Sequence, residues 1–297
     1  MQQRVGSPHV EWWRGSLLAC ALGAALASGG VALAADAPPP ASPYAAPQDV
    51  ASPITDRFYL DAIFFAPDVR TLLRVDPSGM AGAGTPLSGE RDLGWPSSNH
   101  TGLLELMFKL RERSRLRVDY LQLDRSGSVT LDRTVVIGNE TFPCATAPCN
   151  LQSTLDWKTM SFTYTYAFLQ TEHFELGAGL GVHLLQADLM ANAPALLEQH
   201  ETSVSSAFPT GALDGIWSIS RRFAFTFRAQ YLGGTVQGFT GSLGDYHGDF
   251  QYRWRRNLAI GVGDSYFRAN FESEGHHTPG LVRLAIQGPE AFVRVSF

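Results

Sequence analysis

The sequence predicts an all-β chain whose strands close into a transmembrane, antiparallel, up-and-down barrel. Three observations predict this class: apolar and polar residues alternate in segment after segment, an export signal lies at the N-terminus, and short connections alternate with long ones. Alternation with a period of two puts apolar side chains on one face of a strand. No later segment holds the roughly 20 apolar residues that a membrane-crossing helix needs, so strands would have to cross. We expect about ten strands, with eight as the alternative.

Residues 1–34 have the pattern of a cleaved signal peptide. Arg4 and Arg14 precede a nearly uncharged Leu/Ala/Gly run, which ends in the small-residue site Ala32-Leu33-Ala34. This order of charge, apolar run and cleavage site is typical of secretory signals. An uncleaved anchor, or lipoprotein processing at Cys20, is the weaker alternative.

The exported chain divides into a leader and one domain. Residues 35–55 are dominated by Ala, Pro and Ser, which leaves little to bury, so we expect an extended periplasmic leader. Residues 56–297 form one outer-membrane barrel domain without a second linker. Removal of residues 1–34 leaves 21 basic and 27 acidic residues, a net charge of −6. A nucleic-acid partner is not expected, because it would require a basic face.

Ten segments alternate strongly enough to be predicted as strands. They lie near 57–67, 101–111, 115–125, 156–169, 173–188, 207–219, 223–237, 245–255, 258–271 and 280–297. The connections at 112–114, 170–172, 220–222 and 256–257 are short, whereas those at 76–100, 126–155 and 189–206 are long and rich in Gly, Ser, Pro and Asn. This alternation is typical of periplasmic turns and extracellular loops, with both ends of the barrel domain in the periplasm.

The apolar face of each strand is expected to point to lipid and the polar face to the lumen. An aromatic belt close to the short turns supports this orientation; it comprises Phe168, Phe174, Trp217, Phe223 and Trp254. Charges of both signs recur on the opposite face and should pair across a plugged or very narrow lumen. This predicted lumen network consists of Glu105, Lys109, Arg117, Asp119, Glu175, Arg228, Asp249, Arg253 and Arg294.

Two positions fit the alternation poorly. Even-numbered residues up to Ile286 are apolar in the last strand, but odd-numbered ones are apolar after it, so a bulge at Gly288-Pro289 is expected to restore one outward face. Asp264 shares the parity of its apolar neighbours and should point to lipid. Either a bulge turns Asp264 inward, or it lies at the level of the outer headgroups.

Parts of the chain resemble known proteins. The closing strand, which ends on Phe297, resembles the C-terminal signature by which the assembly machinery recognises bacterial outer-membrane barrels. Four further segments resemble a group of proteobacterial outer-membrane β-barrel proteins of unassigned function; these are Leu123–Ser128, Thr130–Arg133, Tyr166–Gln170 and Glu175–His183. The resemblance implies a fold and a location, with lipid and lipopolysaccharide as surroundings. It supplies no catalytic residues.

Candidate chemistry is sparse. Asp245, His247 and Asp249 share an inward face near the predicted extracellular rim, and a carboxylate beside a histidine could activate water. Without a nucleophile at a defined spacing, ordinary lumen polarity is the better interpretation. The glycines of the strand 173–188 are expected to make room for long side chains, since no strand-to-helix turn for a phosphate follows.

The cysteines and histidines of the loops indicate a disulfide and no metal site. Cys144 and Cys149 lie close together in an exported chain and are expected to form a disulfide that closes a loop. Two cysteines without a neighbouring histidine are too few ligands for a metal. The pair His276-His277 is expected to be a solvated part of an outer loop. No cofactor is predicted.

The leading functional hypothesis is a non-enzymatic, porin-like outer-membrane barrel of a Gram-negative envelope. It would be monomeric and would serve envelope structure, surface interaction or the passage of a small solute. One alternative is an outer-membrane hydrolase with the aspartates and histidine at its rim. Another is a soluble periplasmic barrel that binds a ligand and buries its apolar stripe inside.

Overall fold

The computed structural model describes residues 53–146, 148–193, 198–236, 238–273 and 280–297. Ten antiparallel strands form a closed ring, in which each strand pairs with the next and the last pairs with the first. Around the ring they are β1 (Phe58–Phe65), β4 (Thr101–Arg111), β5 (Ser114–Leu131), β8 (Cys149–Gln170), β9 (Phe174–Ala193), β10 (Glu198–Ser218), β11 (Phe223–Val236), β12 (Phe239–Arg255), β13 (Leu258–Ser273) and β14 (Gly280–Ser296). The predicted all-β barrel of ten strands is confirmed.

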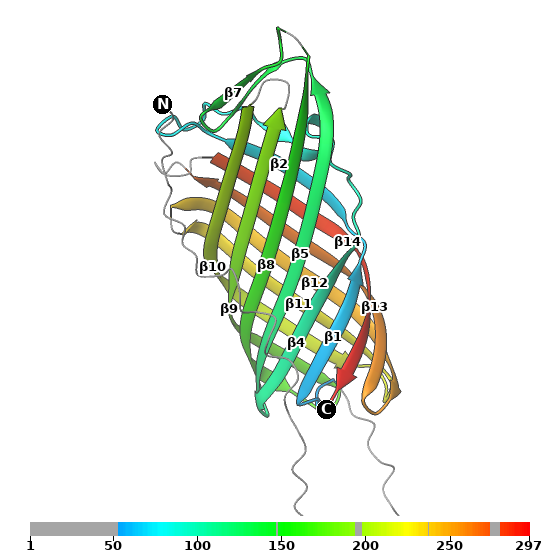
Figure 1. Cartoon of the computed structure of the whole chain (residues 1–297). Helices are drawn as coiled ribbons and strands as arrows, with labels where there is room; N and C mark the ends of the chain where they lie inside the picture. The colour runs from blue at the N-terminus through cyan, green and yellow to red at the C-terminus, as the bar shows by residue number, and fades with distance from the viewer. Residues whose placement is uncertain (1–52, 147, 194–197, 237, 274–279) are drawn as a thin grey trace, which may run out of the picture. The chain divides into compact units, whose positions relative to one another are not determined.

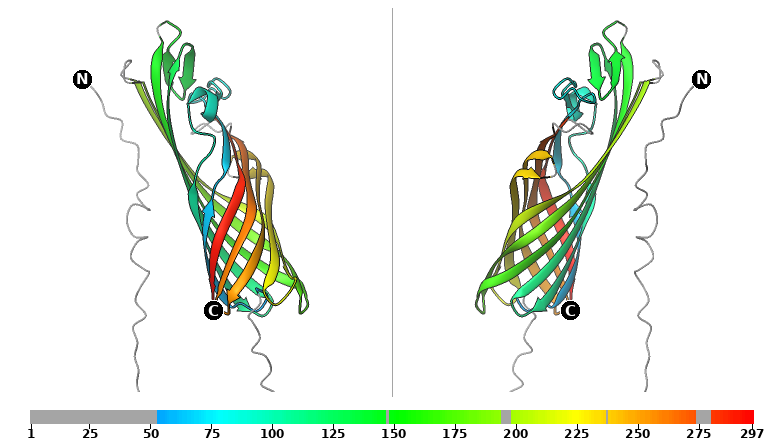
Figure 2. Two further views of the ribbon diagram at one scale, coloured as in Figure 1. Left: turned by 90° about the vertical axis from the view of Figure 1, so that its right-hand side faces the viewer. Right: turned by 90° about the vertical axis from the view of Figure 1, so that its left-hand side faces the viewer.

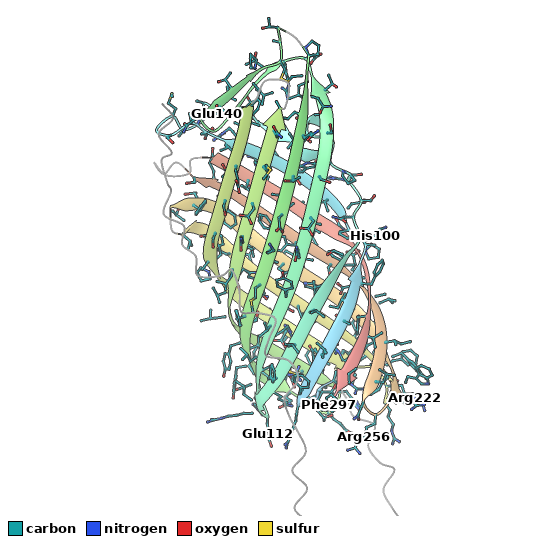
Figure 3. The ribbon with its side chains drawn as sticks, viewed as in Figure 1. His100, Glu112, Glu140, Arg222, Arg256 and Phe297 are labelled. Atoms are coloured by element: carbon teal, nitrogen blue, oxygen red, sulfur yellow. A yellow bond between two sulfur atoms is a disulfide. The ribbon has the colours of Figure 1, made fainter. Side chains whose placement is uncertain are left out.

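The connections distinguish the two ends of the barrel. Short turns join β4 to β5, β8 to β9, β10 to β11 and β12 to β13 at one end, where Glu112, Arg222, Arg256 and Phe297 also lie (Figure 3). We call this the turn end, and the opposite end, which carries Glu140, the loop end. The turn half and the loop half are the corresponding halves of the strands (Figure 1).

Smaller elements lie at the loop end. They are β2 (Asp68–Val75), β3 (Leu87–Ser88), the short helix α1 (Gly89–Asp92) and the hairpin of β6 (Thr134–Ile137) with β7 (Glu140–Pro143). β1 and β2 both pair with β14 and are separated by Ala66-Pro67, so they act as one interrupted wall strand. Proline lacks the N–H that a ladder needs, which accounts for the interruption. No helix among the described residues is long and apolar enough to cross a membrane.

The apolar face points outward, as predicted. Large apolar side chains are exposed around the ring, among them Leu110, Leu180, Phe250, Val262 and Val293. Exposed aromatic residues lie beside the turns; they include Phe168, Trp217, Phe223 and Trp254. Toward the loop end the outward residues change from apolar to tyrosine and then to polar. On β5 the successive outward residues are Tyr120, Gln122 and Asp124. On β13 they are Tyr266, Arg268 and Asn270.

The strands of one wall are longer than the sequence predicted. β5, β8, β9 and β10 continue through residues 126–131, 149–155, 189–193 and 198–206, which were predicted to be loops. These extensions pair in unbroken register, for example from Leu131↔Cys149 onward between β5 and β8. Their Ser, Thr and Gln side chains look like loop residues, but the backbone ladder does not require apolar side chains. Strand β2 was missed for a similar reason, because its arginines obscured the alternation.

The predicted bulge at Gly288-Pro289 is wrong. β13 and β14 pair without a register shift from Leu258↔Val295 to Ser273↔Gly280. Even-numbered residues of β14 point inward along most of its length, so Leu284 and Ile286 are buried in the lumen and Phe292 continues the same face. The prediction assumed that apolar residues always face lipid, whereas the lumen beside these residues of β14 is itself apolar.

Asp264 points outward without a bulge. It is exposed on β13 and pairs with Gly248 on one side and Pro289 on the other. It lies one outward position before Tyr266, so it belongs to the margin of the apolar face. Of the two alternatives for this residue, the inward turn is excluded.

The ring is split in its loop half into two facing walls (Figure 2). One wall is β5-β8-β9-β10, and the other is β2-β14-β13-β12-β11. Pairing between β10 and β11 stops at Gly211↔Tyr231, although both strands continue. Pairing between β4 and β5 stops at Leu103↔Leu121, and β2 does not pair with β5. We call the first gap the open seam and the second, which is filled by residues 76–100, the closed seam.

Candidate functional site

An ion-paired core fills the turn half of the lumen, and Glu105 is at its centre. Its carboxylate accepts a hydrogen bond from the Tyr59 hydroxyl at 2.6 Å, lies 3.2 Å from Arg117 Nε and also pairs with the Arg228 guanidinium. Arg228 reaches Asp119 as well, at 3.4 Å. Glu105 is 1% exposed. A buried charge is tolerated only with this kind of compensation.

The remaining members of the predicted lumen network also point inward in this half. Arg294 holds Asp61 through two hydrogen bonds, including Nε to Oδ1 at 2.8 Å, and its guanidinium lies 3.8 Å from the centre of the Tyr59 ring. Arg115 pairs with Glu175 at 2.9 Å. Tyr59, Asp61 and Arg115 were missing from the prediction. Their inward parity could have revealed them.

The segment before β1 closes the turn end of this core. Asp56 binds Arg253 Nη2 at 2.6 Å, and the Ile54 carbonyl accepts a hydrogen bond from Lys109 Nζ at 2.7 Å. Pro53 and Ile54 are buried. The end of the predicted leader is therefore part of the barrel interior. Beside Glu105 a space of about 10 Å³ remains, which has room for about one water molecule.

An apolar plug lies across the middle of the lumen. Inward aliphatic and aromatic residues from both walls pack there, with Trp157 edge-on to Phe267 at 6.3 Å between ring centres. The plug comprises Ile63, Phe65, Val69, Leu103, Leu121, Leu123, Trp157, Leu185, Leu243, Phe267, Leu284, Ile286 and Phe292. It accounts for the inward apolar residues of β14.

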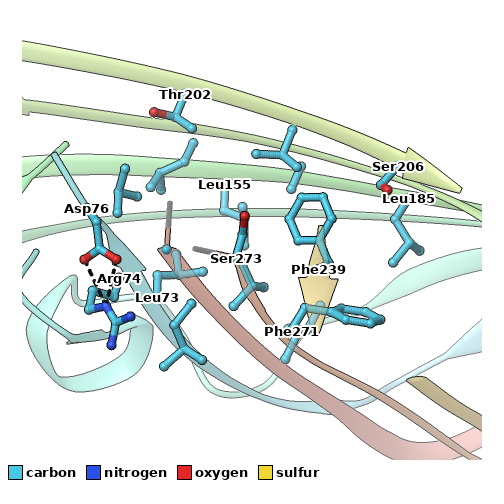
Figure 4. Close-up of a pocket in the computed structure, with 18 of the residues that line it drawn as sticks. Leu73, Arg74, Asp76, Leu155, Leu185, Thr202, Ser206, Phe239, Phe271 and Ser273 are labelled. Carbon is cyan, nitrogen blue, oxygen red and sulfur yellow. Dashed lines mark hydrogen bonds and ion pairs between the residues drawn. The ribbon is translucent and has the colours of Figure 1, made fainter. Parts of the chain in front are cut away.

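Above the plug, the loop half of the lumen contains an apolar cavity of about 250 Å³. Leu155, Leu185 and Leu189 line it from one wall, and Leu73 and Val282 line it from the other. Three phenylalanines lie at one end, Phe208 from β10 with Phe239 from β12 and Phe271 from β13. Phe239 and Phe271 are seen at one end of the close-up and Arg74 with Asp76 at the other (Figure 4).

The polar end of the apolar cavity is built around Asp76. Its carboxylate accepts a hydrogen bond from Arg74 Nε at 2.9 Å and from the backbone N–H groups of Gly82 and Gly84 at 2.9 Å each. Asp76 follows β2, beyond the apolar outer face. Partial burial acts to raise the pKa of its carboxyl, but the two N–H groups and the guanidinium outweigh burial and hold that pKa below its ordinary value.

Asp245 and His247 meet, but away from the rim. His247 lies at the midpoint of β12, and its Nε2 is 2.9 Å from Asp245 Oδ1. Its Nδ1 is 2.6 Å from Ser265 Oγ, and Ser265 also binds Glu290. The predicted position near the extracellular rim is wrong, because the strands extend further past this pair than predicted.

This group has the residue types of a nucleophile and its base, but it lies outside the apolar cavity. Ser265 is 3% exposed, and neither it nor His247 is among the residues that line the apolar cavity. Nucleophilic catalysis requires a reacting atom within reach of the hydroxyl. Asp249 lies two residues closer to the turn end and is buried. Asp245, His247, Ser265 and Glu290 thus partner one another, whereas Asp249 Oδ1 has no hydrogen-bond partner among the described residues. Ser265 and Glu290 were not found from the sequence, although both have inward parity.

The disulfide between Cys144 and Cys149 is confirmed, and it closes the hairpin of β6 and β7 onto β8. No group of three or more His, Cys, Asp or Glu side chains among the described residues is arranged to hold a metal ion. His276 and His277 lie outside the described residues. Phe297 closes the ring against β1, with its N–H donating to the Phe58 carbonyl at 2.9 Å.

Several solved structures of outer-membrane proteins are similar to this chain. The outer membrane protease OmpT from Escherichia coli superposes with a TM-score of 0.55 at 10% identity, over 80% of this chain and 97% of that one. The chain has the fold of bacterial outer-membrane β-barrels. Neisserial surface protein A matches with a TM-score of 0.32 at 12% identity, over 81% and 97% of the two chains. An outer membrane channel (COG4313) from Pseudomonas putida F1 gives 0.35 at 10% identity, over 84% and 99%.

No protein-family model matches the sequence, and no curated protein is significantly similar to it. The structure of OmpT confirms the fold that the resemblance implied. At 10% identity the similarity to OmpT concerns the fold and not the activity.

Proposed function

We propose that the protein is a non-enzymatic outer-membrane barrel that binds a small apolar solute in the loop half of its lumen and does not conduct ions. The signal peptide, residues 1–34, would be cleaved on export, and the closing strand with Phe297 would be recognised by the assembly machinery. The turn end would face the periplasm and the loop end the cell surface. The exposed apolar face supports this placement, since a soluble barrel would bury it.

The observation that carries the proposal is the apolar cavity. Apolar cavities of about 150 Å³ bind benzene when they are closed to water. The larger space here would accommodate one or two fused aromatic rings, or a short alkyl chain. Because Arg74 and Asp76 satisfy each other at its polar end, the solute needs no charge.

Passage through the barrel is not part of the proposal. An ion entering from the surface side would have to cross the apolar plug and then the ion-paired core. The first barrier offers no ligands to an ion, and the second leaves space for about one water molecule beside Glu105. We expect no conductance steps in planar bilayers. Steady ohmic conductance would support the narrow-channel hypothesis instead.

The test of binding uses 1-bromonaphthalene, whose bromine quenches indole fluorescence on contact. Trp157 lines the apolar cavity and is 3% exposed. We expect a saturable component of quenching in the detergent-purified protein that disappears in Trp157→Phe. Ala187→Phe fills the cavity and should abolish this component, whereas Gln186→Phe puts the same ring on the outer face and should leave it. Equal quenching in the two phenylalanine variants would refute the proposal.

The enzymatic alternative has its own test. If the group around His247 is structural, His247→Ala should leave the lipid and peptide composition of the outer membrane unchanged. A difference that depends on His247 but not on the folded amount of protein would favour the hydrolase.

A further inference from the structure

The apolar cavity is closed on three sides by the described residues. Toward the periplasm lies the apolar plug. Toward the cell surface the β6–β7 hairpin and residues 76–85 are joined over the cavity. The joining hydrogen bonds run from Ser78 N to Asn139 Oδ1, from Gly138 N to the Val75 carbonyl and from Thr85 N to the Val136 carbonyl, each at 2.9 Å.

The closed seam is the third side. Arg125 of β5 is 3% exposed and donates to Glu90 Oε1 at 2.9 Å and to the Pro96 carbonyl at 2.6 Å. Trp95 is 2% exposed and donates to Ser153 Oγ at 2.9 Å. Between β2 and β5, side chains and backbone thus replace the missing ladder with buried polar contacts.

The fourth side is the open seam, and it is built differently. β10 continues beyond Gly211 and lines the apolar cavity, but β11, its neighbour in the ring, contributes none of the lining residues. Instead Phe208 of β10 stacks on Phe271 of β13, with 4.2 Å between ring centres, and lies 6.0 Å from the Phe239 ring of β12. We call these three residues the aromatic trio. Here the packing of these three rings spans the gap where the ladder between β10 and β11 has ended.

Residues of β10 and β11 beside the open seam disfavour pairing between these two strands. Pro209 has no N–H for a ladder, and it stands in β10 just beyond the last row paired with β11. On β11, Gly234 has a φ of +144°, a conformation that other residues rarely adopt, and it lies beyond the last row that pairs with β10. The gap begins beside Tyr231, at the row of tyrosines where the outer face changes from apolar to polar. Its lower end therefore lies at the edge of the hydrocarbon layer.

We infer that the open seam is a lateral door through which the apolar solute passes between the cavity and the outer leaflet of the membrane. The inference rests on the proposed function of the same cavity. Opening separates the aromatic trio and breaks no ladder between β10 and β11, whereas the closed seam and the joined loops would have to break buried polar contacts or backbone hydrogen bonds. An apolar solute also concentrates in the hydrocarbon layer, so an opening at its margin meets the largest supply.

The test bridges the two edges from outside the cavity. If the register of β10 and β11 were extended, the exposed residues Pro209 and Gly233 would face each other two positions beyond the last paired row. A Pro209→Cys/Gly233→Cys variant is treated with a short bismaleimide, which bridges the edges. The control is the same variant treated with N-ethylmaleimide, which adds similar groups without a bridge. The variant is produced without residues 1–34, so its native cysteines are Cys144 and Cys149, which are paired and do not react.

Both samples are reconstituted in dimyristoylphosphatidylcholine vesicles, 1-bromonaphthalene is added by rapid mixing, and the rate of Trp157 quenching is followed by stopped flow. We expect the bridged protein to respond more slowly by about tenfold or more, since its door cannot widen, with the same final quenching. Equal rates would overturn the lateral door but leave the binding proposal intact. Absence of saturable quenching in both samples, and in the wild type, would refute the binding proposal itself.

A second variant keeps the test decisive if the bridge forms poorly. Phe208→Ala removes the β10 member of the aromatic trio and should accelerate quenching several-fold at unchanged vesicle composition. An unchanged or slower rate in a folded Phe208→Ala barrel would contradict the door.

Discussion

The turn half and the loop half of this barrel are made by the same strands but are held together by different forces. In the turn half the ring is fully paired, and buried charges of both signs fill the lumen. In the loop half the ring divides into two walls, the lumen is apolar, and a cavity of about 250 Å³ remains. In this barrel, pairing between neighbouring strands and the filling of the lumen by side chains therefore go together. Where the ladder is complete the interior is filled, and where it is interrupted an apolar cavity remains.

The largest effect is expected from a charge in the turn half. Arg228→Ala leaves Glu105 and Asp119 without their shared partner, and removal of one member of a buried ion pair costs about 3–5 kcal/mol. Thr163→Ala is the control, because Thr163 is equally interior and forms no hydrogen bond through its hydroxyl. Urea unfolding in detergent would measure both. Equal midpoints would show that the ion-paired core does not stabilise this half.

The next effect concerns the closed seam of the loop half. A Cβ added to Gly127 would overlap the Leu93 carbonyl of the inserted segment. Gly127→Ala should therefore destabilise the fold by about 1–3 kcal/mol, as overpacking does. At Gly102 nothing lies within 4 Å of an added Cβ, so Gly102→Ala should change stability by less than about 0.5 kcal/mol. If both substitutions were tolerated alike, the seam would be looser than described.

A smaller and local effect is expected from the disulfide. Cys144 and Cys149 close a short loop, for which the entropy of loop closure predicts about 2 kcal/mol. The barrel should keep its unfolding midpoint in Cys144→Ser/Cys149→Ser, because both cysteines lie at the loop end. Limited proteolysis of the β6–β7 hairpin should become faster. Loss of the whole barrel's stability would mean that the hairpin supports the ring.

The smallest effect is a response to acid at the polar end of the apolar cavity. The pKa of Asp76 is lowered in the folded chain, so its contribution to stability is present above the ordinary pKa of about 3.9 and is lost as the pH falls through the lowered value. The amide signals of Gly82 and Gly84 should stay constant from pH 7 to about 4 and shift only below that. In Asp76→Asn they should already be displaced at pH 7. Titration of the wild-type signals near pH 5 would contradict the assignment.

The fold could be predicted from the sequence because one physical rule governs most of it. Lipid outside and polar groups inside impose a period of two, and Leu104 to Leu110 on β4 or Phe223 to Phe227 on β11 obey it. The rule gave a wrong result where the lumen is apolar and not polar. Leu284 and Ile286 face an apolar lumen, so their parity was assigned to the wrong side, and a bulge was introduced to correct it.

The ion-paired core was predictable as a set of residues, and the apolar cavity was not. Charges that recur on an inward face must pair, so Glu105, Arg228 and Arg294 could be named. Asp56, the partner of Arg253, comes from the segment before β1, and no pattern placed it inside the barrel. The cavity depends on where two strands separate, at Gly211 and Tyr231, which is a property of the ring and not of either strand.

A crystal structure of the detergent-purified protein soaked with 1-bromonaphthalene, with diffraction recorded at the bromine absorption edge, would show directly which half of the lumen takes an apolar solute. We expect one anomalous peak in the loop half, between Trp157, Leu189 and the aromatic trio, and none in the turn half. A peak within the ion-paired core, or an empty cavity at saturating ligand, would contradict the division of the barrel into a sealed half and a binding half.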